Sequence, residues 1–228
     1  RISFPLKNIS PFVVSAGGLP FGVPSAAQEA AELAVVLDWL SDRLGDAVDT
    51  AVDAGRVGLA GHSRGGKVAW LLLADDTSRA DAVAGIDPVD GTGGPFGGEA
   101  SALDGLDGLP LAELVIGAGL GPLPVGPLQI ACAPADEGHA AFFAVASAPA
   151  TRVVAPAYGH QDVLDAQTPG CGGTCSLCPS GPPDGGLRQL TGGLLVAFFA
   201  AELRGETALL EHATDPDAAP IDIVVETK

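Results

Sequence analysis

A short turn between a predicted strand and a predicted helix constrains this chain more than any other feature. Residues 57–60 form an apolar run typical of a strand, and residues 67–74 follow a helical pattern. Between them lies Gly61-His62-Ser63-Arg64-Gly65, a G-x-S-x-G pattern. In a strand–turn–helix context this pattern holds a serine hydroxyl clear of a sheet, where it can act as a nucleophile. We expect glycine on both sides of Ser63 because a side chain there would collide with neighbouring backbone.

Strands and helices alternate along the rest of the chain. The apolar patterns predict strands over residues 11–16, 82–87, 111–117 and 151–155, and helices over residues 28–44, 136–145 and 194–203. This alternation predicts an α/β fold with a mostly parallel, doubly wound sheet and helices on both faces. Reactive groups are then expected at the carboxyl edge of the strands. We expect a single domain over residues 1–228, with a poorly packed tail over residues 205–228.

The charge of the chain excludes one class of partner. Eleven basic and 28 acidic residues give a formal net charge of -17. No basic stripe is present, so the sequence predicts no nucleic-acid partner. Anionic lipid would repel such a surface, so any contact with a membrane should be apolar.

A serine that transfers acyl groups needs a general base, and four histidines are available. His160 follows the predicted strand over residues 151–155 directly, at the edge where a base is expected. His62 lies inside the turn, His139 opens a predicted helix where it could cap or pack, and His212 lies in the predicted tail. We therefore predict that His160 is the base.

The acid that orients this base should lie between the serine and the histidine in the sequence. Asp87 ends a predicted strand and is followed by Pro88, so its side chain should emerge beside Ser63. Asp90 and Asp162 remain rivals, because either could lie on a loop at the same edge. We favour Asp87 as the acid.

Three of the four cysteines lie close together near the end of the chain. Cys171, Cys175 and Cys178 have a C-x3-C-x2-C spacing that imitates an iron–sulfur motif, but too little chain follows to surround a cluster. A zinc site would need a fourth ligand, and Cys132, His139 or His160 could serve. A local disulfide or free thiols in a loop rich in glycine and proline is the interpretation we favour. We expect no metal and no protein cofactor.

Several blocks of the sequence resemble the chlorophyllase family and follow one another in that family's order. They are residues 61–66 (GHSRGG), 85–89 (GIDPV), 115–122, 132–134 with His139 and Phe142, and 158–165. The late cysteine loop and residues 191–198 are similar to its C-terminal segment, so the resemblance covers roughly residues 12–203. Many lipases and polyester hydrolases carry Gly-His-Ser-x-Gly, but rarely with Arg64 in the variable position.

The resemblance implies an α/β-hydrolase that cleaves the phytyl ester of chlorophyll to chlorophyllide and phytol. It implies that Ser63 is the nucleophile, Asp87 the acid and His160 the base. It also implies that Mg²⁺ is part of the substrate and not a cofactor of the protein. It also implies a chloroplast location and peripheral contact with membranes that bear pigment. A general lipid or polyester esterase, and a relative that only binds a tetrapyrrole or lipid, remain alternatives.

When the serine attacks an ester, the carbonyl oxygen becomes negatively charged and needs two hydrogen-bond donors. The backbone N–H of Arg64 is the first candidate, because Arg64 follows the nucleophile directly. The second donor should come from a loop before the strand over residues 11–16. Residues 4–8 are the candidate for this loop, but they are a poor one because the segment is too short. We therefore expect the family's N-terminal strands and oxyanion loop to be missing from this sequence.

Two segments after Asp87 have open interpretations. Residues 91–98 lack the Gly-Lys-Ser/Thr ending of a phosphate loop, so they could form a flap over an apolar site or a plain surface loop. The leucines at positions 103, 106, 109 and 111 could line a phytyl groove or belong to the core.

Overall fold

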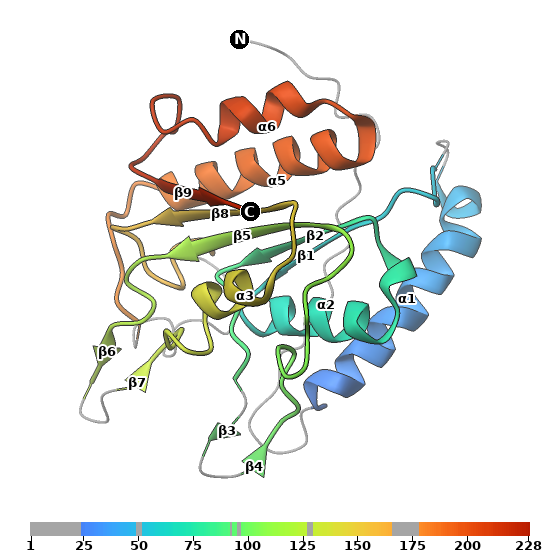
Figure 1. The fold of residues 1–228 in the computed structure, drawn as a ribbon, viewed down its shortest axis with the longest axis horizontal. Coiled ribbons are helices and arrows are strands. Elements are labelled where there is room, and N and C mark those ends of the chain that lie inside the picture. Colours follow the sequence, from blue (N-terminus) through green and yellow to red (C-terminus); the bar gives the residue numbers. More distant parts are fainter. Residues whose placement is uncertain (1–23, 49–51, 92, 95–96, 127–129, 166–177) are drawn as a thin grey trace.

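A five-stranded sheet forms the centre of the molecule in the computed structural model, which describes residues 24–48, 52–91, 93–94, 97–126, 130–165 and 178–228 (Figure 1). The strands stand in the order β1-β2-β5-β8-β9. Neighbours pair in parallel, except that β9 runs antiparallel to β8. The strands are β1 (Gly58–His62), β2 (Ala82–Ile86), β5 (Ala112–Ala118), β8 (Ala150–Ala155) and β9 (Val224–Thr227). The four parallel strands therefore end at one common edge.

Helices cover both faces of this sheet, as the alternation of the sequence predicts (Figure 1). On one face lie α1 (Ala26–Ala47), α2 (Arg64–Asp75) and α3 (His139–Val145). On the other lie α5 (Gly186–Arg204) and α6 (Thr207–Ala213).

The residues of β5 divide between two hydrophobic clusters, because successive side chains of a strand point to opposite faces. Val115 packs with α2, whereas Leu114 and Ile116 pack with α5. Every residue of β5 is buried, as expected for a parallel strand that is covered on both sides. The burial of each large apolar side chain contributes about 1.5–3 kcal/mol.

The predicted elements agree with the structure except at some boundaries. α1 begins at a capping box, in which Ser25 Oγ accepts from the Gln28 N–H and the Gln28 side chain accepts from the Ser25 N–H. α5 begins at Gly186, earlier than predicted, because burial of Leu187 and Leu190 outweighs the low helix propensity of two interior glycines. The strand predicted over residues 11–16 lies outside the described residues.

The C-terminal segment differs from the expected loose tail over residues 205–228. α6 packs against α5, and β9 extends the sheet through its pairing with β8. Leu210, Ile223 and Val225 pack against the hydrophobic cluster on the α5 face. Lys228 Nζ donates to the carbonyls of Phe143, Ala144 and Ala146 at the end of α3. Acidic and proline residues between these apolar positions conceal their pattern in the sequence.

The four leucines at positions 103, 106, 109 and 111 lie in the core or pack against it. Leu109 is buried, and Leu103, Leu106 and Leu111 pack against the same hydrophobic cluster as α2. Leu103, Leu106 and Leu111 remain partly exposed, so a phytyl groove along them stays a prediction.

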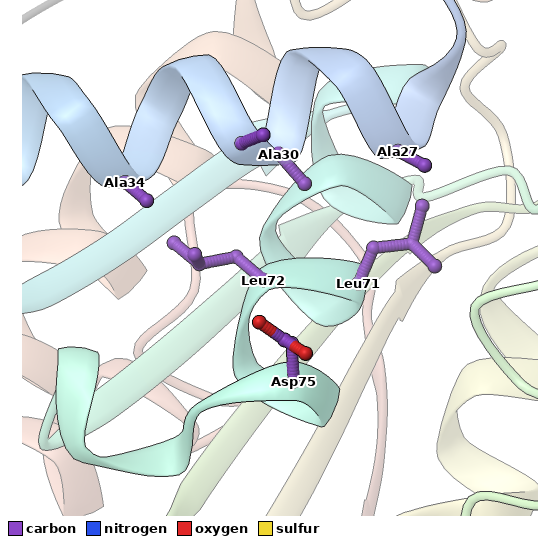
Figure 2. Close-up of a pocket in the computed structure, with 7 residues that line it drawn as sticks. Ala27, Ala30, Ala34, Leu71, Leu72 and Asp75 are labelled. Atoms are coloured by element: carbon purple, nitrogen blue, oxygen red, sulfur yellow. The ribbon is translucent and has the colours of Figure 1, made fainter.

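A cleft of about 320 Å³ lies between α1 and α2 (Figure 2). Small side chains on α1 face leucines and one aspartate on α2; the lining residues are Ala27, Ala30, Ala31, Ala34, Leu71, Leu72 and Asp75. Among the described residues that line this cleft there is no histidine, serine or cysteine, so it is not the site around Ser63. Among the helices of the described ranges, none is both long and apolar enough to cross a membrane.

A buried lysine joins α2 to the segment that follows β2. Lys67 is 1% exposed, and its Nζ donates to the carbonyls of Asp90 and Gly91. The same nitrogen lies 3.6 Å from the Asp90 carboxylate and 3.7 Å from that of Glu99. Asp90 in turn accepts from the Ser101 hydroxyl at 2.5 Å and from the Ala102 N–H at 2.7 Å. This buried network holds the segment that follows Asp87 against α2.

Replacing Lys67 with methionine should therefore destabilise the fold. The change leaves the Asp90 charge buried without its cation, which typically costs about 3–5 kcal/mol in free energy of unfolding. Arg79→Met is the matched control, because Arg79 pairs with the more exposed Asp38 and Asp76 and a surface pair contributes about 1 kcal/mol or less. Urea denaturation of both variants measures the difference. Equal losses in the two variants would contradict a buried ion pair at Lys67.

Candidate active site

Ser63 occupies a sharp turn between β1 and α2. Its backbone has φ 55° and ψ −124°, a conformation that a residue with a side chain rarely adopts. Three hydrogen bonds hold it there: the Ser63 N–H donates to Ile86 O at 3.0 Å, and Ser63 O accepts from the N–H groups of Gly66 at 3.0 Å and Val89 at 3.2 Å. The turn is thus anchored to β2 and to the segment after it, which is the geometry expected of a nucleophile elbow.

Glycine is required on one side of Ser63 but not on the other. A Cβ at Gly61 would lie 2.1 Å from the Gly65 carbonyl oxygen, so a side chain is excluded there. At Gly65 a Cβ would meet no described atom within 4 Å, so the predicted collision is wrong for that position. The second close approach is at Gly66, where a Cβ would lie 2.6 Å from Pro88 Cβ. The residue after the motif, Gly66, therefore lets α2 approach the end of β2.

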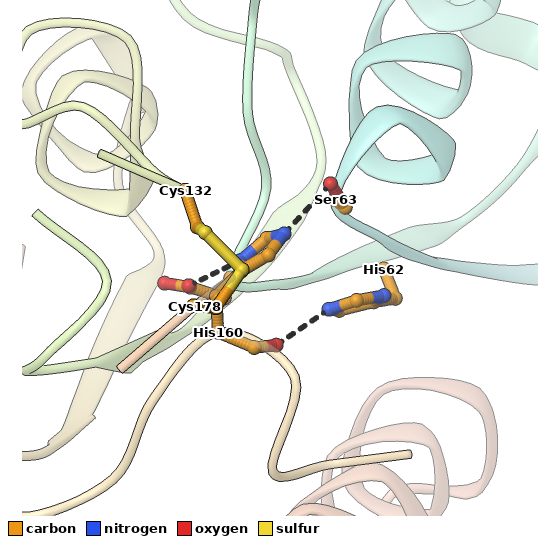
Figure 3. The surroundings of a disulfide bond; sticks show 6 residues. His62, Ser63, Cys132, His160 and Cys178 are labelled. Atoms are coloured by element: carbon orange, nitrogen blue, oxygen red, sulfur yellow. Dashed lines mark hydrogen bonds and ion pairs between the residues drawn. A yellow bond between two sulfur atoms is a disulfide. The ribbon is translucent and has the colours of Figure 1, made fainter. Parts of the chain in front are cut away.

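The structure brings Ser63, His160 and Asp87 into one hydrogen-bonded series (Figure 3). Ser63 Oγ lies 2.9 Å from His160 Nε2, and His160 Nδ1 lies 2.7 Å from Asp87 Oδ2. The His160 and Asp87 side chains are 3% and 4% exposed. A carboxylate on Nδ1 requires the tautomer that carries its proton there, which leaves Nε2 free to accept the serine proton.

Asp87 is held by its own backbone as well as by His160. It adopts φ 40°, its N–H donates to Ile116 O at 2.6 Å, and its Oδ1 accepts from the Ala118 N–H at 3.0 Å. These bonds link Asp87, just past the end of β2, to the end of β5. The carboxylate therefore points along the sheet edge toward His160.

The two rival carboxylates have other partners. Asp90 pairs with Lys67 in the buried network described above. Asp162 Oδ2 accepts from the N–H groups of Gly159 and Gly181, both at 2.7 Å. Asp162 thus stabilises the loop that carries His160, whereas Asp87 is the carboxylate bonded to the imidazole.

The other three histidines have different surroundings. His139 begins α3, packs its ring against Gly117, and has its pKa lowered by burial. His212 lies exposed in the last turn of α6. His62 contacts His160 directly: its Nε2 lies 2.9 Å from the His160 carbonyl oxygen, and the two rings are 4.8 Å apart. Sequence reasoning missed this contact, for which the position of His62 beside Ser63 was the only signal.

Arg64 begins α2, where the first backbone N–H groups of a helix have no partner within it. Its side chain extends away, to Glu29 Oε2 at 2.8 Å, to Glu99 at 2.6 and 2.9 Å, and to Pro24 O at 2.9 Å. The hydrogen bond from Arg64 lowers the pKa of Glu99. The candidate second oxyanion donor, at residues 4–8, lies outside the described residues.

The glycine-rich segment after Asp87 forms a short hairpin. Its strands are β3 (Gly93–Gly94) and β4 (Gly97–Gly98), which pair antiparallel. Residues 92 and 95–96 lie outside the described residues, so a flap and a plain surface loop both remain predictions.

A disulfide joins Cys132 to Cys178 across 46 residues of sequence (Figure 3). It ties the segment before α3 to the segment after the His160 loop, so the prediction of a local disulfide or a free thiol is wrong for Cys178. Cys171 and Cys175 lie outside the described residues. His160 already has a partner on each ring nitrogen, which removes it as a zinc ligand. In the described part of the chain, no three metal-ligating side chains are grouped as a metal site would require.

Comparisons with known proteins identify relatives of this chain. A family model described as Chlorophyllase matches residues 11–228. Chlorophyllase-2 of Arabidopsis thaliana is 37% identical over 180 residues, which are 72% of this chain and 56% of the relative. Chlorophyllase-1 of the same plant is 34% identical, over 71% of this chain and 54% of the relative. Chlorophyllase-1, chloroplastic, of Citrus sinensis is 34% identical, over 73% and 52% respectively. The chain thus spans about half the length of the curated relatives it matches.

A solved structure shares the fold. The ferulic acid esterase from Streptomyces cinnamoneus aligns with a TM-score of 0.58 at 24% sequence identity, over 89% of this chain and 55% of that chain. Together with the mostly parallel sheet, this likeness confirms the predicted α/β-hydrolase fold. Because both the family model and the plant relatives span most of the chain, it belongs to the chlorophyllase family.

Proposed function

We propose that this protein is a serine carboxylesterase that hydrolyses the phytyl ester of chlorophyll to chlorophyllide and phytol. The observation that carries the proposal is the unbroken series Ser63 Oγ, His160 Nε2, His160 Nδ1, Asp87 Oδ2 at the carboxyl edge of the sheet. Membership of the chlorophyllase family supports the choice of substrate.

In this proposal Ser63 attacks the ester carbonyl while His160 takes the hydroxyl proton. The carbonyl oxygen becomes an oxyanion, for which the Arg64 N–H at the start of α2 is one donor. The carbon–oxygen bond to phytol then breaks, and the phytol oxygen takes the proton from His160. The chlorophyllide acyl group remains on Ser63 until water, deprotonated by the same imidazole, releases it.

Asp87 stabilises the charge that forms on His160 during both steps. Its carboxylate is nearly excluded from solvent and shares its other oxygen with the Ala118 N–H, so solvent screens its attraction for an imidazolium only weakly. No protein cofactor takes part in these steps, and Mg²⁺ remains a component of the pigment.

We also propose a chloroplast location and contact with pigment-bearing membranes. The Citrus relatives carry the word chloroplastic in their names, which supports the first of these. The chain's charge of -17 means that contact with an anionic membrane would have to be apolar.

Ser63→Ala should abolish ester hydrolysis and labelling by a fluorophosphonate probe, because the nucleophilic oxygen is removed. Loss of a nucleophilic serine typically costs several decades in kcat, so activity should fall below about 1% of wild type. Ser41→Ala, at an exposed position of α1, is the control and should leave activity unchanged. An unlabelled wild type would favour the alternative of a relative that only binds pigment or lipid.

Asp87→Asn should lower kcat by about 10⁴-fold, because an amide no longer imposes the required tautomer on the imidazole. Asp162→Asn is the matched control. An asparagine oxygen can still accept from the Gly159 and Gly181 N–H groups, so we expect a much smaller loss. Steady-state kinetics on a soluble ester measures both variants. A greater loss in Asp162→Asn would transfer the role of the acid to that residue.

Chlorophyll or pheophytin should exceed p-nitrophenyl acetate in kcat/KM by at least roughly tenfold, although the short ester has the better leaving group. A phytyl chain has about 20 carbons, and each buried CH₂ contributes ~0.8 kcal/mol. Binding of the chain can therefore offset part of the barrier. The methyl ester of chlorophyllide is the matched control, since it keeps the pigment and removes the chain. A faster short ester would favour a general lipid or polyester esterase.

A further inference from the structure

The nucleophile and the proposed base stand on strands that are not neighbours. Ser63 follows β1 and His160 follows β8, and β2 and β5 lie between these strands. The hydrogen bonds between strands therefore fix the distance between Ser63 and His160 only indirectly, through the two strands that lie between them. A catalytic hydrogen bond is sensitive to displacements of about 1 Å, which can cost 10²-fold in rate.

His62 links these two parts of the site directly. It is the last residue of β1, adjacent to Ser63, and its Nε2 lies 2.9 Å from the main-chain carbonyl of His160. Its ring lies 4.8 Å from the His160 ring, at an interplanar angle of 32° (Figure 3). One side chain thus contacts both the backbone and the imidazole of the proposed base.

Other bonds hold the His160 loop from its opposite side. The Leu120 N–H donates to Tyr158 O at 2.9 Å, and Asp162 holds the Gly159 N–H. These contacts tie the loop to the end of β5 and to the segment around Gly181. The His62 contact adds the tie to β1, the strand that carries the nucleophile.

We propose that His62 is a positioning residue, which holds His160 at the correct distance and angle from Ser63 through one hydrogen bond and one ring contact. This inference rests on the proposed function, because positioning matters only where His160 acts on Ser63. A carbonyl oxygen can only accept, so His62 must carry a proton on Nε2.

The protonation state of His62 is suited to this role. Burial, followed by the nearby His160, lowers the pKa of His62 to about 4. In the described part of the chain, the titratable groups that act on it are His160 and Asp87. His62 is therefore neutral at pH 7 and adds no positive charge beside the imidazolium that forms on His160.

Two variants separate the hydrogen bond from the ring contact. His62→Gln keeps a neutral N–H donor that can reach the His160 carbonyl, whereas His62→Phe keeps a ring and removes the donor. On a soluble short ester, we expect His62→Phe to lower kcat by about tenfold to 10²-fold with KM changed less than about twofold. His62→Gln should recover most of this loss. His212→Phe, at an exposed histidine, is the control and should leave kcat unchanged.

A merely structural role predicts a different pattern. If His62 only stabilised the fold, the activity lost in each variant would follow the decrease in its urea denaturation midpoint. The donor in His62→Gln would then give no rescue. Equal kcat values for wild type and His62→Phe would overturn the proposal, and so would a loss confined to KM.

NMR of the histidine rings tests the same inference without activity. At pH 7, His62 should be the neutral tautomer with the proton on Nε2, and His62→Phe should speed hydrogen exchange at the backbone around His160. A proton on Nδ1 of His62, or unchanged exchange, would overturn the positioning role. If wild type hydrolyses no ester but both NMR results hold, the proposed function fails while the link between His62 and His160 stands.

Discussion

The turn at Ser63 is the constraint on which the remaining site depends. Its positive φ costs about 1–3 kcal/mol in a residue with a side chain, and hydrogen bonds to Ile86 and Val89 hold it in place. Both partners belong to β2 or to the segment just after it, next to Asp87. The strained turn is thus tied to the residues on either side of Asp87, whose own bonds reach Ile116 and Ala118. The His160 loop is then the third part to be aligned.

Ionic contacts made by the first residues of α2 hold the segments that surround the Ser63 turn. Arg64 ties the start of α2 to α1 through Glu29 and to the end of the glycine-rich hairpin through Glu99. One turn further along α2, Lys67 holds the main chain after Asp87 through the carbonyl of Asp90. The side chains that follow Ser63 in the helix therefore anchor the segments that flank the proposed site. This arrangement gives a physical reason for Arg64 within the Gly61 to Gly65 turn and for Lys67 just after it.

Much of the fold was predictable because its signals are local. The apolar runs that become β1, β2, β5 and β8, and the Gly61 to Gly65 turn, depend on residues adjacent in sequence. The segments that became α6 and β9 were not predictable in the same way. Their apolar residues are few and acquire a role only when Leu210 and Val225 meet the cluster on the α5 face. The true start of α5 was missed for the same reason, since burial there overrides the preference of individual residues.

The sequence by itself determined the turn chemistry, the chain order of serine, aspartate and histidine, and the strands after which each stands. These follow from local sterics and from the rule that parallel strands end at one edge. Only the tertiary structure shows that Asp87, rather than Asp90 or Asp162, is bonded to the imidazole, because Lys67 holds Asp90 and two glycine N–H groups hold Asp162. It also decided that Cys132 pairs with Cys178 and that His62 touches His160. Each of these contacts joins residues far apart in the chain, and sequence patterns carry no information on distances of that kind.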